Sequence, residues 1–584
     1  MVLQIRPLLF HCFLCVKGIR YLHLQTILLK HTVAAIIAGN KSPYGTFEEP
    51  GVANGIAPAA KIAFLDISST VGKLNPPSDN DVLSTGRVST NGRSPIAHIH
   101  SMSWGSKNVF YYNNQARMFD NYMFANDDFL AVVAAGNEGL GDKASSVTAP
   151  GNSKNVLSVG ASHSFGYDLV RGQLGPSYVA SFSSRGPTTD GRIAPDVVAP
   201  GKYILSAAAR PNSPGACDPL DGDVPQAGEN MEGLFSQAGS SMSAPLVAGA
   251  AALVRQYFEQ GWYGDGTKDS GSYFSPSGAL VKATLINGAQ TDIRGVDNGS
   301  GRITEVTAYD NNAGFGRVSL TDSLYVAGKT GVGFRFWDGE RLFDGDVAKT
   351  YEVTIDKSRG CDANDLSVTL AWIEEGSPPG CTKCLLNDLD LYVTERGKDS
   401  KRYHPNGRSI KDHSNNVERV VIDGAEDGSS YTIYVEAYNL NSLSQKYALV
   451  ATGCFGGRTN TLDTAQNVFS SQSDGGGGSD STNRSIIIAC ASVGGAIVVC
   501  LCLALFRRHQ QKSKKKEMEK KKKATQKKVA QKKVARKKAP VTQNTKQKEK
   551  PHKKQKAKQK GKPHKKQTGG ATESRLKRER PRKC

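Results

Sequence analysis

The chain has 584 residues, a length that corresponds to about two to four domains. Its formal net charge of +21 comes from 75 Lys and Arg against 54 Asp and Glu, but residues 507–584 hold 34 of the basic residues and 5 of the acidic ones. The first 506 residues therefore carry 41 basic and 49 acidic residues and are mildly acidic. The overall positive charge therefore predicts an acidic partner only for residues 507–584 and not for the rest of the chain.

Apolar runs alternate with Gly-rich turns and Ala-rich stretches between Gly51 and Leu320. Alternation of strands and helices predicts an α/β domain, here over residues 32–325, with a parallel sheet covered by helices on both faces. The expected strands are Ala59–Leu65, Phe129–Ala135 and Val156–Val159, and the expected helices are Ala244–Tyr257 and Ala279–Ile286.

Residues 331–455 show a different pattern, with half-buried strands separated by turns rich in Gly, Asn, Asp and Pro. The spacing of these strands predicts an all-β sandwich domain. The expected strands are Lys349–Ile355, Leu366–Trp372, Leu389–Thr394, Val417–Ile422 and Tyr431–Tyr438.

A linker that contains Gly and Ser, residues 456–484, leads to Ser485–Phe506, which has no charged residue. As a helix this segment would be about 33 Å long, enough for a hydrocarbon core of about 30 Å. A buried core helix is the alternative, but neither flank can supply a surrounding core. Because Arg507 and Arg508 follow at once, we expect a single-pass type I membrane protein, with the body extracellular or luminal and the basic end cytoplasmic.

The basic end, residues 507–584, is low in complexity and repeats short Lys-rich motifs. So many like charges with so few apolar residues predict a disordered tail. Next to a membrane, such a tail favours anionic lipid by about 1 kcal/mol per basic residue. No aromatic residue is interleaved with the lysines to stack on bases, so no specific nucleic-acid partner is expected.

Four cysteines lie in the region of the sandwich domain: Cys361, Cys381, Cys384 and Cys454. A disulfide among them is expected if this region is extracytoplasmic, and its connectivity stays open. The spacing Cys381-x-x-Cys384 also suits a metal or redox site. It lacks a second ligand pair and a strand–helix setting, which favours the disulfide.

The sharpest local motif is Gly239–Pro245, a Gly-Ser turn that leads into an apolar, Ala-rich helix. At the start of a helix, backbone N–H groups and the helix dipole stabilise a developing negative charge. Pro245 fits the first helical turn, where its missing N–H removes no intrahelical bond. Ser241 is therefore a candidate nucleophile, and a Ser-capped core helix is the alternative for this segment taken alone.

Six motifs in order resemble the subtilase family over most of residues 51–320. The serine motif is similar to the family's serine box, which implies that Ser241 is the nucleophile of a serine endopeptidase. Ala134–Gly139 resembles the oxyanion box, which implies that Asn137 donates to the oxyanion. The other matches are Gly55–Ala60, Ser101–Gly105, Ser181–Pro187 and Ala194–Gly201.

The resemblance also implies where a polypeptide substrate binds. Ser101–Gly105 resembles the strand that pairs with an extended substrate by β-augmentation. The implied substrate-binding residues are Ser103, Trp104, Gly105, Ala135 and Gly136.

The segment Asn387–Leu391 resembles part of the C-terminal β-sandwich of certain alkaline subtilases. No cofactor is expected for catalysis, but members of that group bind calcium. Asp388 and Asp390 offer the carboxylate oxygens that a hard cation favours, and two aspartates flanking a turn are the alternative.

The resemblance fails near the N-terminus, because the family needs Asp, His and Ser in that chain order. Aligning residues 33–34 with the family's His box places Leu29 at the catalytic position and His31 two residues late, so that His31 would point elsewhere. His31 is thus a doubtful base. No Asp precedes Asp66, and the strand that should carry the catalytic Asp is missing.

Residues 1–31 are expected to replace a lost or wrongly assembled N-terminal region. Leu8–Val16 is apolar with Arg6 before it, as in a signal segment, but His11 interrupts the run and no convincing cleavage site follows.

Three functions therefore compete. The first is a membrane-anchored serine endopeptidase, weakly active in this incomplete form. The second is a pseudoprotease that keeps the cleft as a peptide-binding or adhesive ectodomain, and the third is a structural membrane protein whose basic tail is the working part. The intact serine and oxyanion motifs favour the first over the third.

Overall fold

The computed structural model of the chain describes residues 2–6, 32–39, 54–65, 68–70, 73–74, 83–84, 86–87, 97–165, 174–207, 234–298, 303–307, 309–358, 361, 363–398, 401–455 and 466–467. The chain divides into two compact units, Met1–Gln472 and Ser473–Cys584, and the described residues belong to the first. In the part of the chain that is described, no helix is both long enough and apolar enough to cross a bilayer. The predicted linker, membrane span and basic tail lie outside the described residues apart from 466–467.

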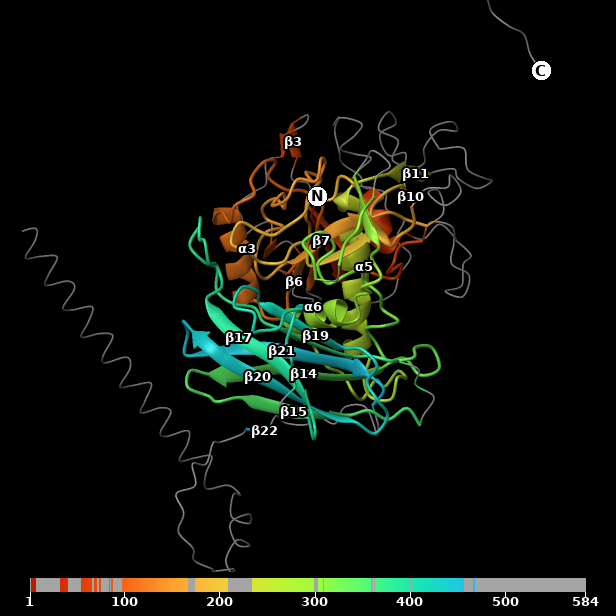
Figure 1. Ribbon diagram of the computed structural model, residues 1–584. Helices are drawn as coiled ribbons and strands as arrows, with labels where there is room; N and C mark the ends of the chain where they lie inside the picture. Colours follow the sequence, from red (N-terminus) through yellow and green to blue (C-terminus); the bar gives the residue numbers. More distant parts are fainter. Residues whose placement is uncertain are drawn as a thin grey trace, which may run out of the picture. The chain divides into compact units, whose positions relative to one another are not determined.

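A nine-stranded sheet forms the centre of the N-terminal domain, in the order β13-β12-β8-β7-β6-β5-β1-β2, with β9 paired to β7 (Figure 1). The neighbours β5, β6, β7 and β9 run parallel, and their residues are almost all buried. Such apolar runs are typical of strands covered on both faces. The strands are β1 (Val2–Arg6), β2 (Lys61–Leu65), β5 (Ile99–Met102), β6 (Leu130–Ala134), β7 (Leu157–Ser162), β8 (Tyr178–Val179), β9 (Val197–Pro200), β12 (Gly295–Asp297) and β13 (Ile303–Thr304).

The predicted α/β class is confirmed, but the sheet is mixed rather than purely parallel. β1 (Val2–Arg6) pairs antiparallel with both β2 and β5, although no strand was expected in residues 1–31. The two neighbours of β1 run parallel to each other and each has an edge to pair, so a short extended segment fits between them in either direction. The strand carries no aspartate.

Helices that the structure describes pack on this sheet, among them α3, α5 and α6. α5 (Ser240–Glu259) contacts β5, β6, β7 and β9, and its close approach to residues 55–57 depends on Gly249, where a Cβ would lie 2.7 Å from the Cβ of Ile56. α3 (Asn114–Ala125) contacts β6. α6 (Gly278–Asn287) contacts β6 and also the strands of the second domain, so all of its residues are buried. The predicted helices at α5 and α6 are confirmed.

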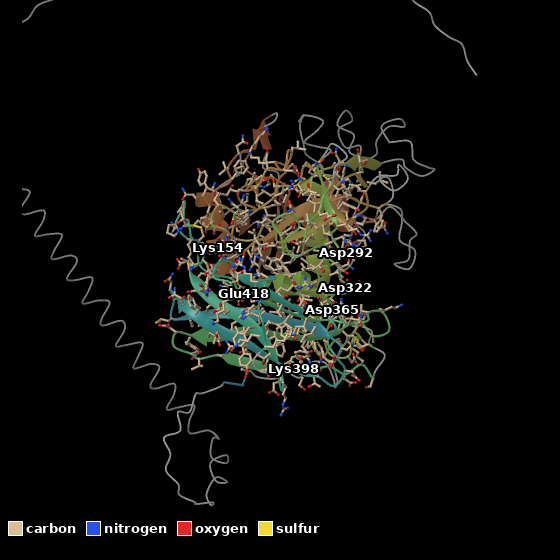
Figure 2. The ribbon with its side chains drawn as sticks, viewed as in Figure 1. Lys154, Asp292, Asp322, Asp365, Lys398 and Glu418 are labelled. Atoms are coloured by element: carbon tan, nitrogen blue, oxygen red, sulfur yellow. A yellow bond between two sulfur atoms is a disulfide. The ribbon has the colours of Figure 1, made fainter. Side chains whose placement is uncertain are left out.

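The second domain is the predicted sandwich, made of two antiparallel sheets (Figure 2). One has the order β14-β21-β16-β19 and the other β18-β17-β20-β15-β22. β14 and β21 were not predicted, because charged residues interrupt the alternation in β14 and β21 is apolar along most of its length. The strands are β14 (Gly333–Phe343), β15 (Lys349–Thr354), β16 (Leu366–Ala371), β17 (Asn387–Glu395), β18 (Arg402–Tyr403), β19 (Val417–Ile422), β20 (Ser430–Leu440), β21 (Ser444–Gly453) and β22 (Gln466–Asn467).

Two disulfides pair the four cysteines of this region. One joins Cys361 to Cys454, and the other joins Cys381 to Cys384. The open choice between a disulfide and a metal site at Cys381-x-x-Cys384 is thereby decided for the disulfide.

Candidate active site

Ser241 lies in the first turn of α5 and is half-buried. The turn before it depends on Gly239, whose φ of 149° favours glycine, and whose N–H donates to the carbonyl of Gly201 at 2.8 Å. The Met242 N–H donates to the Gly239 carbonyl at 2.9 Å and closes the turn. The backbone therefore fixes the place of the candidate nucleophile at the N-terminus of a 20-residue helix.

Ser103 lies directly beside Ser241, just after the end of β5. The Ser241 hydroxyl donates to the Ser103 carbonyl at 3.2 Å, and the Ser103 hydroxyl donates to the Ser241 carbonyl at 2.8 Å. This reciprocal pair ties the start of α5 to the predicted substrate-binding segment. The Ser241 hydroxyl is thus bonded to a carbonyl, which cannot serve as a catalytic base at neutral pH.

Asn137 follows β6, and parallel strands end at the same edge of the sheet, so it lies near Ser103 and Ser241. Its Oδ1 accepts from the Ser240 N–H at 2.8 Å and from the Ser240 hydroxyl at 3.0 Å. With Oδ1 held by these two donors, the NH₂ group lies on the opposite side of an exposed side chain. The two hydrogen bonds thus orient the Asn137 amide, a neutral hydrogen-bond donor, near Ser241.

Two glycines of the predicted substrate-binding segments face the same threonine. A Cβ on Gly105 would lie 2.7 Å from Thr148 Oγ1, and a Cβ on Gly136 would lie 2.9 Å from the same atom and 2.8 Å from Ser184 Oγ. Thr148 also donates its N–H to the Ala135 carbonyl at 3.0 Å. Thr148 and Ser184 therefore pack between the segments that follow β5 and β6. Sequence reasoning missed both, although Ser184 belongs to one of the recognised motifs.

The remaining predicted residues of this site have different outcomes. Trp104 is half-buried, and Ala135 is fully buried with its N–H donating to the Val159 carbonyl at 2.9 Å. His31 lies outside the described residues, as does Asp66. The helix that begins after His31, residues 32–38, is described, and the Thr32 hydroxyl donates to the Ala207 carbonyl at 3.0 Å.

A second polar cluster lies in the sandwich domain. Asp388 and Asp390 of β17 and His413 place one ligand atom each within 4.8 Å of one another. His413 Nδ1 lies 3.2 Å from Asp388 Oδ2 and 3.8 Å from Asp390 Oδ1, while Lys411 Nζ lies 3.1 Å from Asp390 Oδ2. The group has the donor types of a metal site, and it includes a histidine that sequence reasoning missed.

Glu418 of β19 adds a buried carboxylate to this cluster (Figure 2). Its Oε2 accepts from the Leu391 N–H at 2.5 Å, whereas Oε1 accepts no hydrogen bond from any residue that the structure describes. Burial, followed by the charge of Asp390, raises the pKa of Glu418 well above its usual range. Burial also raises the pKa values of Asp388 and Asp390. The cluster thus contains buried carboxylate oxygens, Asp390 Oδ1 and Glu418 Oε1, that accept no hydrogen bond from the described residues.

Comparisons with known proteins find similar sequences and structures for parts of the chain. Residues 31–316 match the family described as the subtilase family. The chain is 26% identical over 535 residues to the serine protease/ABC transporter B family protein tagD of Dictyostelium discoideum, covering 72% of this chain and 28% of that protein. It is 39% identical over 127 residues to the serine protease AprX of Bacillus subtilis, covering 22% of this chain and 26% of AprX. The chain therefore spans little more than a quarter of either relative.

Two solved structures are also similar. Sphericase aligns with a TM-score of 0.32 and 22% identity, over 50% of this chain and 76% of that one. Fervidolysin from Fervidobacterium pennivorans aligns with a TM-score of 0.31 and 19% identity, over 70% of this chain and 51% of that one. The match over residues 31–316 identifies this part of the chain as a member of the subtilase family of serine-type endopeptidases.

Proposed function

We propose that the chain is a membrane-anchored, subtilisin-like serine endopeptidase that hydrolyses polypeptides through Ser241, and that the 584-residue form is weakly active. The observation that carries the proposal is the position of the Asn137 amide beside Ser241, held by two hydrogen bonds from Ser240. When Ser241 Oγ attacks a carbonyl carbon, the negative charge develops on the carbonyl oxygen, which would lie between this amide and the N-terminus of α5. Stabilisation of that charge is what the site supplies.

The step that needs a base is the transfer of the Ser241 proton. The Ser241 hydroxyl donates to the Ser103 carbonyl. In a competent site this hydroxyl must instead donate to a histidine, which takes the proton. His31 is the candidate in this chain, and the family's aspartate would hold the histidine in its orientation. In subtilisin, loss of the histidine lowers kcat about 2 × 10⁶-fold, and the residual rate is about 10³–10⁴ over water. We expect the 584-residue chain to be in that residual range.

The serine assignment is tested by labelling with a fluorophosphonate probe. A longer gene product that contains the family's His and Asp motifs should be labelled, and Ser241→Ala should abolish the labelling. Ser243→Ala is the matched control, since Ser243 lies in the same helix but is fully buried. Labelling that survives Ser241→Ala shows that the nucleophile is another residue. Fast peptide turnover by the purified 584-residue chain contradicts the proposed weak activity.

A pseudoprotease that binds peptides without cleaving them is the second candidate. It is favoured by the bond of the Ser241 hydroxyl to a carbonyl and by β1, which lies between β2 and β5 and carries no aspartate. Genomic DNA upstream of the Thr32 codon distinguishes the two. An in-frame histidine box preceded by a strand with an aspartate supports the enzyme, and its absence supports the pseudoprotease.

We further propose that the cluster around Asp388 and Asp390 holds a structural calcium ion. Its support is the set of buried carboxylate oxygens with too few donors, which suits a hard cation. The ion would stabilise the sandwich domain and take no part in peptide hydrolysis.

The proposed anchor is Ser485–Phe506, with the basic tail in the cytoplasm. Protease added to intact cells that express a full-length form should remove the body and spare a fragment containing residues 507–584. An epitope at Cys584 should stain only after permeabilisation, since the Lys-rich flank is expected on the cytoplasmic side. Staining of intact cells shows that the orientation is reversed.

A further inference from the structure

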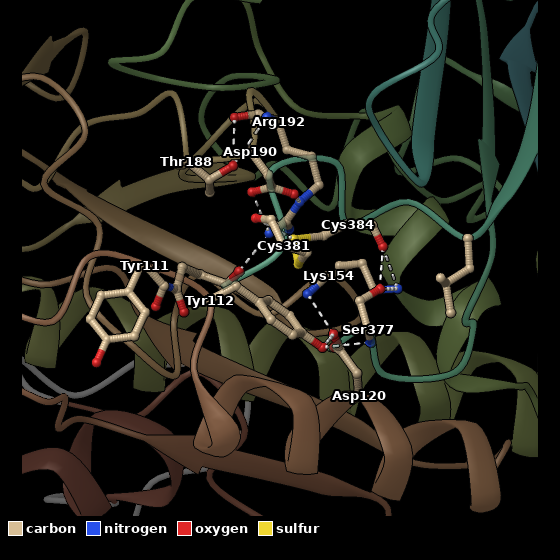
Figure 3. The surroundings of a disulfide bond; sticks show 12 residues. Tyr111, Tyr112, Asp120, Lys154, Thr188, Asp190, Arg192, Ser377, Cys381 and Cys384 are labelled. Atoms are coloured by element: carbon tan, nitrogen blue, oxygen red, sulfur yellow. Dashed lines mark hydrogen bonds and ion pairs between the residues drawn. A yellow bond between two sulfur atoms is a disulfide. The ribbon is translucent and has the colours of Figure 1, made fainter. Parts of the chain in front are cut away.

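We infer that the Cys381–Cys384 disulfide holds a loop of the sandwich domain that positions the substrate-binding segment, so that a dithiol loosens the cleft by reducing it. The inference rests on the proposed function, because it concerns the peptide cleft beside Ser241. The loop is residues 372–386, between β16 and β17, and we call it the docking loop. It reaches from the sandwich domain to the N-terminal domain, where its disulfide lies near Tyr112 (Figure 3).

The docking loop makes backbone hydrogen bonds to the N-terminal domain. The Gly380 N–H donates to the Tyr112 carbonyl at 2.7 Å, and the Ser377 N–H donates to the Tyr112 hydroxyl at 3.1 Å. The Gly376 N–H donates to Asn121 Oδ1 of α3 at 2.8 Å. These bonds depend on the loop's backbone shape, which a disulfide between residues three apart constrains directly.

A buried lysine of the N-terminal domain also binds the docking loop. Lys154 Nζ donates to the Glu375 carbonyl at 2.9 Å, to Ser377 Oγ at 2.9 Å and to the Cys384 carbonyl at 3.0 Å, and it pairs with Glu374. The Cys384 carbonyl belongs to one of the two bridged residues. Lys154 therefore holds both ends of the loop, and the disulfide constrains the end that contains Cys384.

Tyr112 connects the disulfide to the cleft. Its ring packs with Ala116 and Cys384, and Cys381 packs against this group. The Tyr112 hydroxyl donates to Asp120 Oδ2 at 2.7 Å. Tyr112 is fixed on both sides, by the docking loop and by α3.

The chain runs without interruption from Tyr112 back to the substrate-binding residues Ser103–Gly105. Along the way, the Ser106 N–H donates to the Ala149 carbonyl at 2.7 Å, and the Ala149 N–H donates to the Val109 carbonyl at 2.9 Å. Ala149 follows Thr148, the residue between Gly105 and Gly136. A change in the position of Tyr112 is thereby transmitted to the segments that follow β5 and β6, which contain Gly105 and Gly136.

The disulfide is open to chemical attack on one side. Cys381 is half-buried between exposed residues, whereas Cys384 is buried. A thiolate of an external dithiol attacks Cys381 Sγ and the bond to Cys384 Sγ breaks. The second thiol of the reagent then closes on the mixed disulfide, which leaves two protein thiols and an oxidised, disulfide-bonded reagent. Two electrons and two protons pass from the reagent to the protein.

The experiment compares hydrogen exchange of residues 101–113 before and after treatment with dithiothreitol. We expect faster exchange after reduction, and the same in the double variant Cys381→Ser/Cys384→Ser without reagent. The control is Cys361→Ser/Cys454→Ser, which removes a disulfide within the sandwich domain. It should melt at a lower temperature but leave exchange of residues 101–113 unchanged, and all variants are compared below their melting points.

A second measurement reports on the cleft itself. Affinity of an extended fluorescent peptide for the Ser241→Ala protein should fall about five- to 150-fold on reduction, the usual range of coupling between sites. Because coupling is reciprocal, saturating peptide should make the disulfide harder to reduce by the same factor. If the disulfide were purely structural, its reduction would lower the melting temperature without changing the affinity for the peptide.

The outcomes separate the two proposals. If exchange responds to reduction but the peptide binds neither form, the positioning role holds and the proposed function is wrong. If the peptide binds equally to both forms, or if exchange is the same in both, the positioning role is wrong and the proposed function is unaffected.

Discussion

Two groups of buried charges lie in different parts of the molecule and are satisfied to different degrees (Figure 2). Lys154, between the domains, is fully buried, and its ammonium group has four acceptors, including Glu374. Glu374 in turn accepts from the backbone N–H groups of Leu386 and Asn387. Each charged atom of this pair therefore has partners within the protein.

The carboxylates of the sandwich domain differ. Asp390 and Glu418 are also fully buried, but Asp390 Oδ1 and Glu418 Oε1 accept no hydrogen bond from the described part of the chain. A buried carboxylate oxygen that accepts no hydrogen bond is costly, and a bound cation would offset that cost. Lys154 and Glu374 thus form a structural ion pair between the domains, whereas the second group is the proposed cation site.

The largest loss of stability is expected from breaking the ion pair between Lys154 and Glu374. Lys154→Met should lower the free energy of unfolding by about 3–5 kcal/mol, because Glu374 would remain buried and unpaired. Urea unfolding measures this loss. The double variant Lys154→Met/Glu374→Leu should be less harmful than Lys154→Met, since it leaves no isolated charge.

The control for this prediction is Lys398→Met, which removes an ion pair to Glu395 whose lysine is exposed. An exposed pair contributes about 0–1 kcal/mol, so the change should be small. Equal losses in the free energy of unfolding for Lys154→Met and Lys398→Met would contradict a structural role of Lys154 between the domains.

A bound cation should stabilise the carboxylates of the sandwich domain, some of whose oxygens lack hydrogen-bond donors in the described part of the chain. Calcium at 100 times its Kd should raise the free energy of unfolding by about 2.7 kcal/mol, measured as a shift in the unfolding midpoint. Asp390→Asn should abolish the shift. Asp365→Asn, which changes an exposed aspartate elsewhere in the sandwich domain, should leave it intact. No shift in the parent protein would rule out a calcium site.

The smallest effect concerns pH in the absence of a cation. The raised pKa values of Asp388, Asp390 and Glu418 mean that the folded state holds protons more tightly than the unfolded state. Stability should therefore fall as pH rises above about 4, the range in which unfolded carboxyl groups ionise. Glu418→Gln should reduce this loss, and bound calcium, which needs ionised carboxylates, should stabilise more strongly as pH rises.

The sequence by itself determined the elements whose signal is local. The parallel strands β6 and β7 and the helices α5 and α6 were predicted because their apolar runs and turn residues lie within one short window. The serine and oxyanion motifs were readable for the same reason. Each combines a special backbone turn with the side chain that acts there, so Ser241 and Asn137 were named from residues that are neighbours in the chain.

Only the tertiary structure decided which distant residues meet. Lys154 and Glu374 are 220 positions apart, and the Cys361–Cys454 pairing closes a separation of 93 residues. Thr148 was not singled out from the sequence, and only the fold places it against Gly105 and Gly136. His413 and Glu418 joined the predicted aspartates through the packing of a loop and a strand beside β17. Such contacts depend on how whole elements pack, and a single sequence records the preferences of each element but not its neighbours.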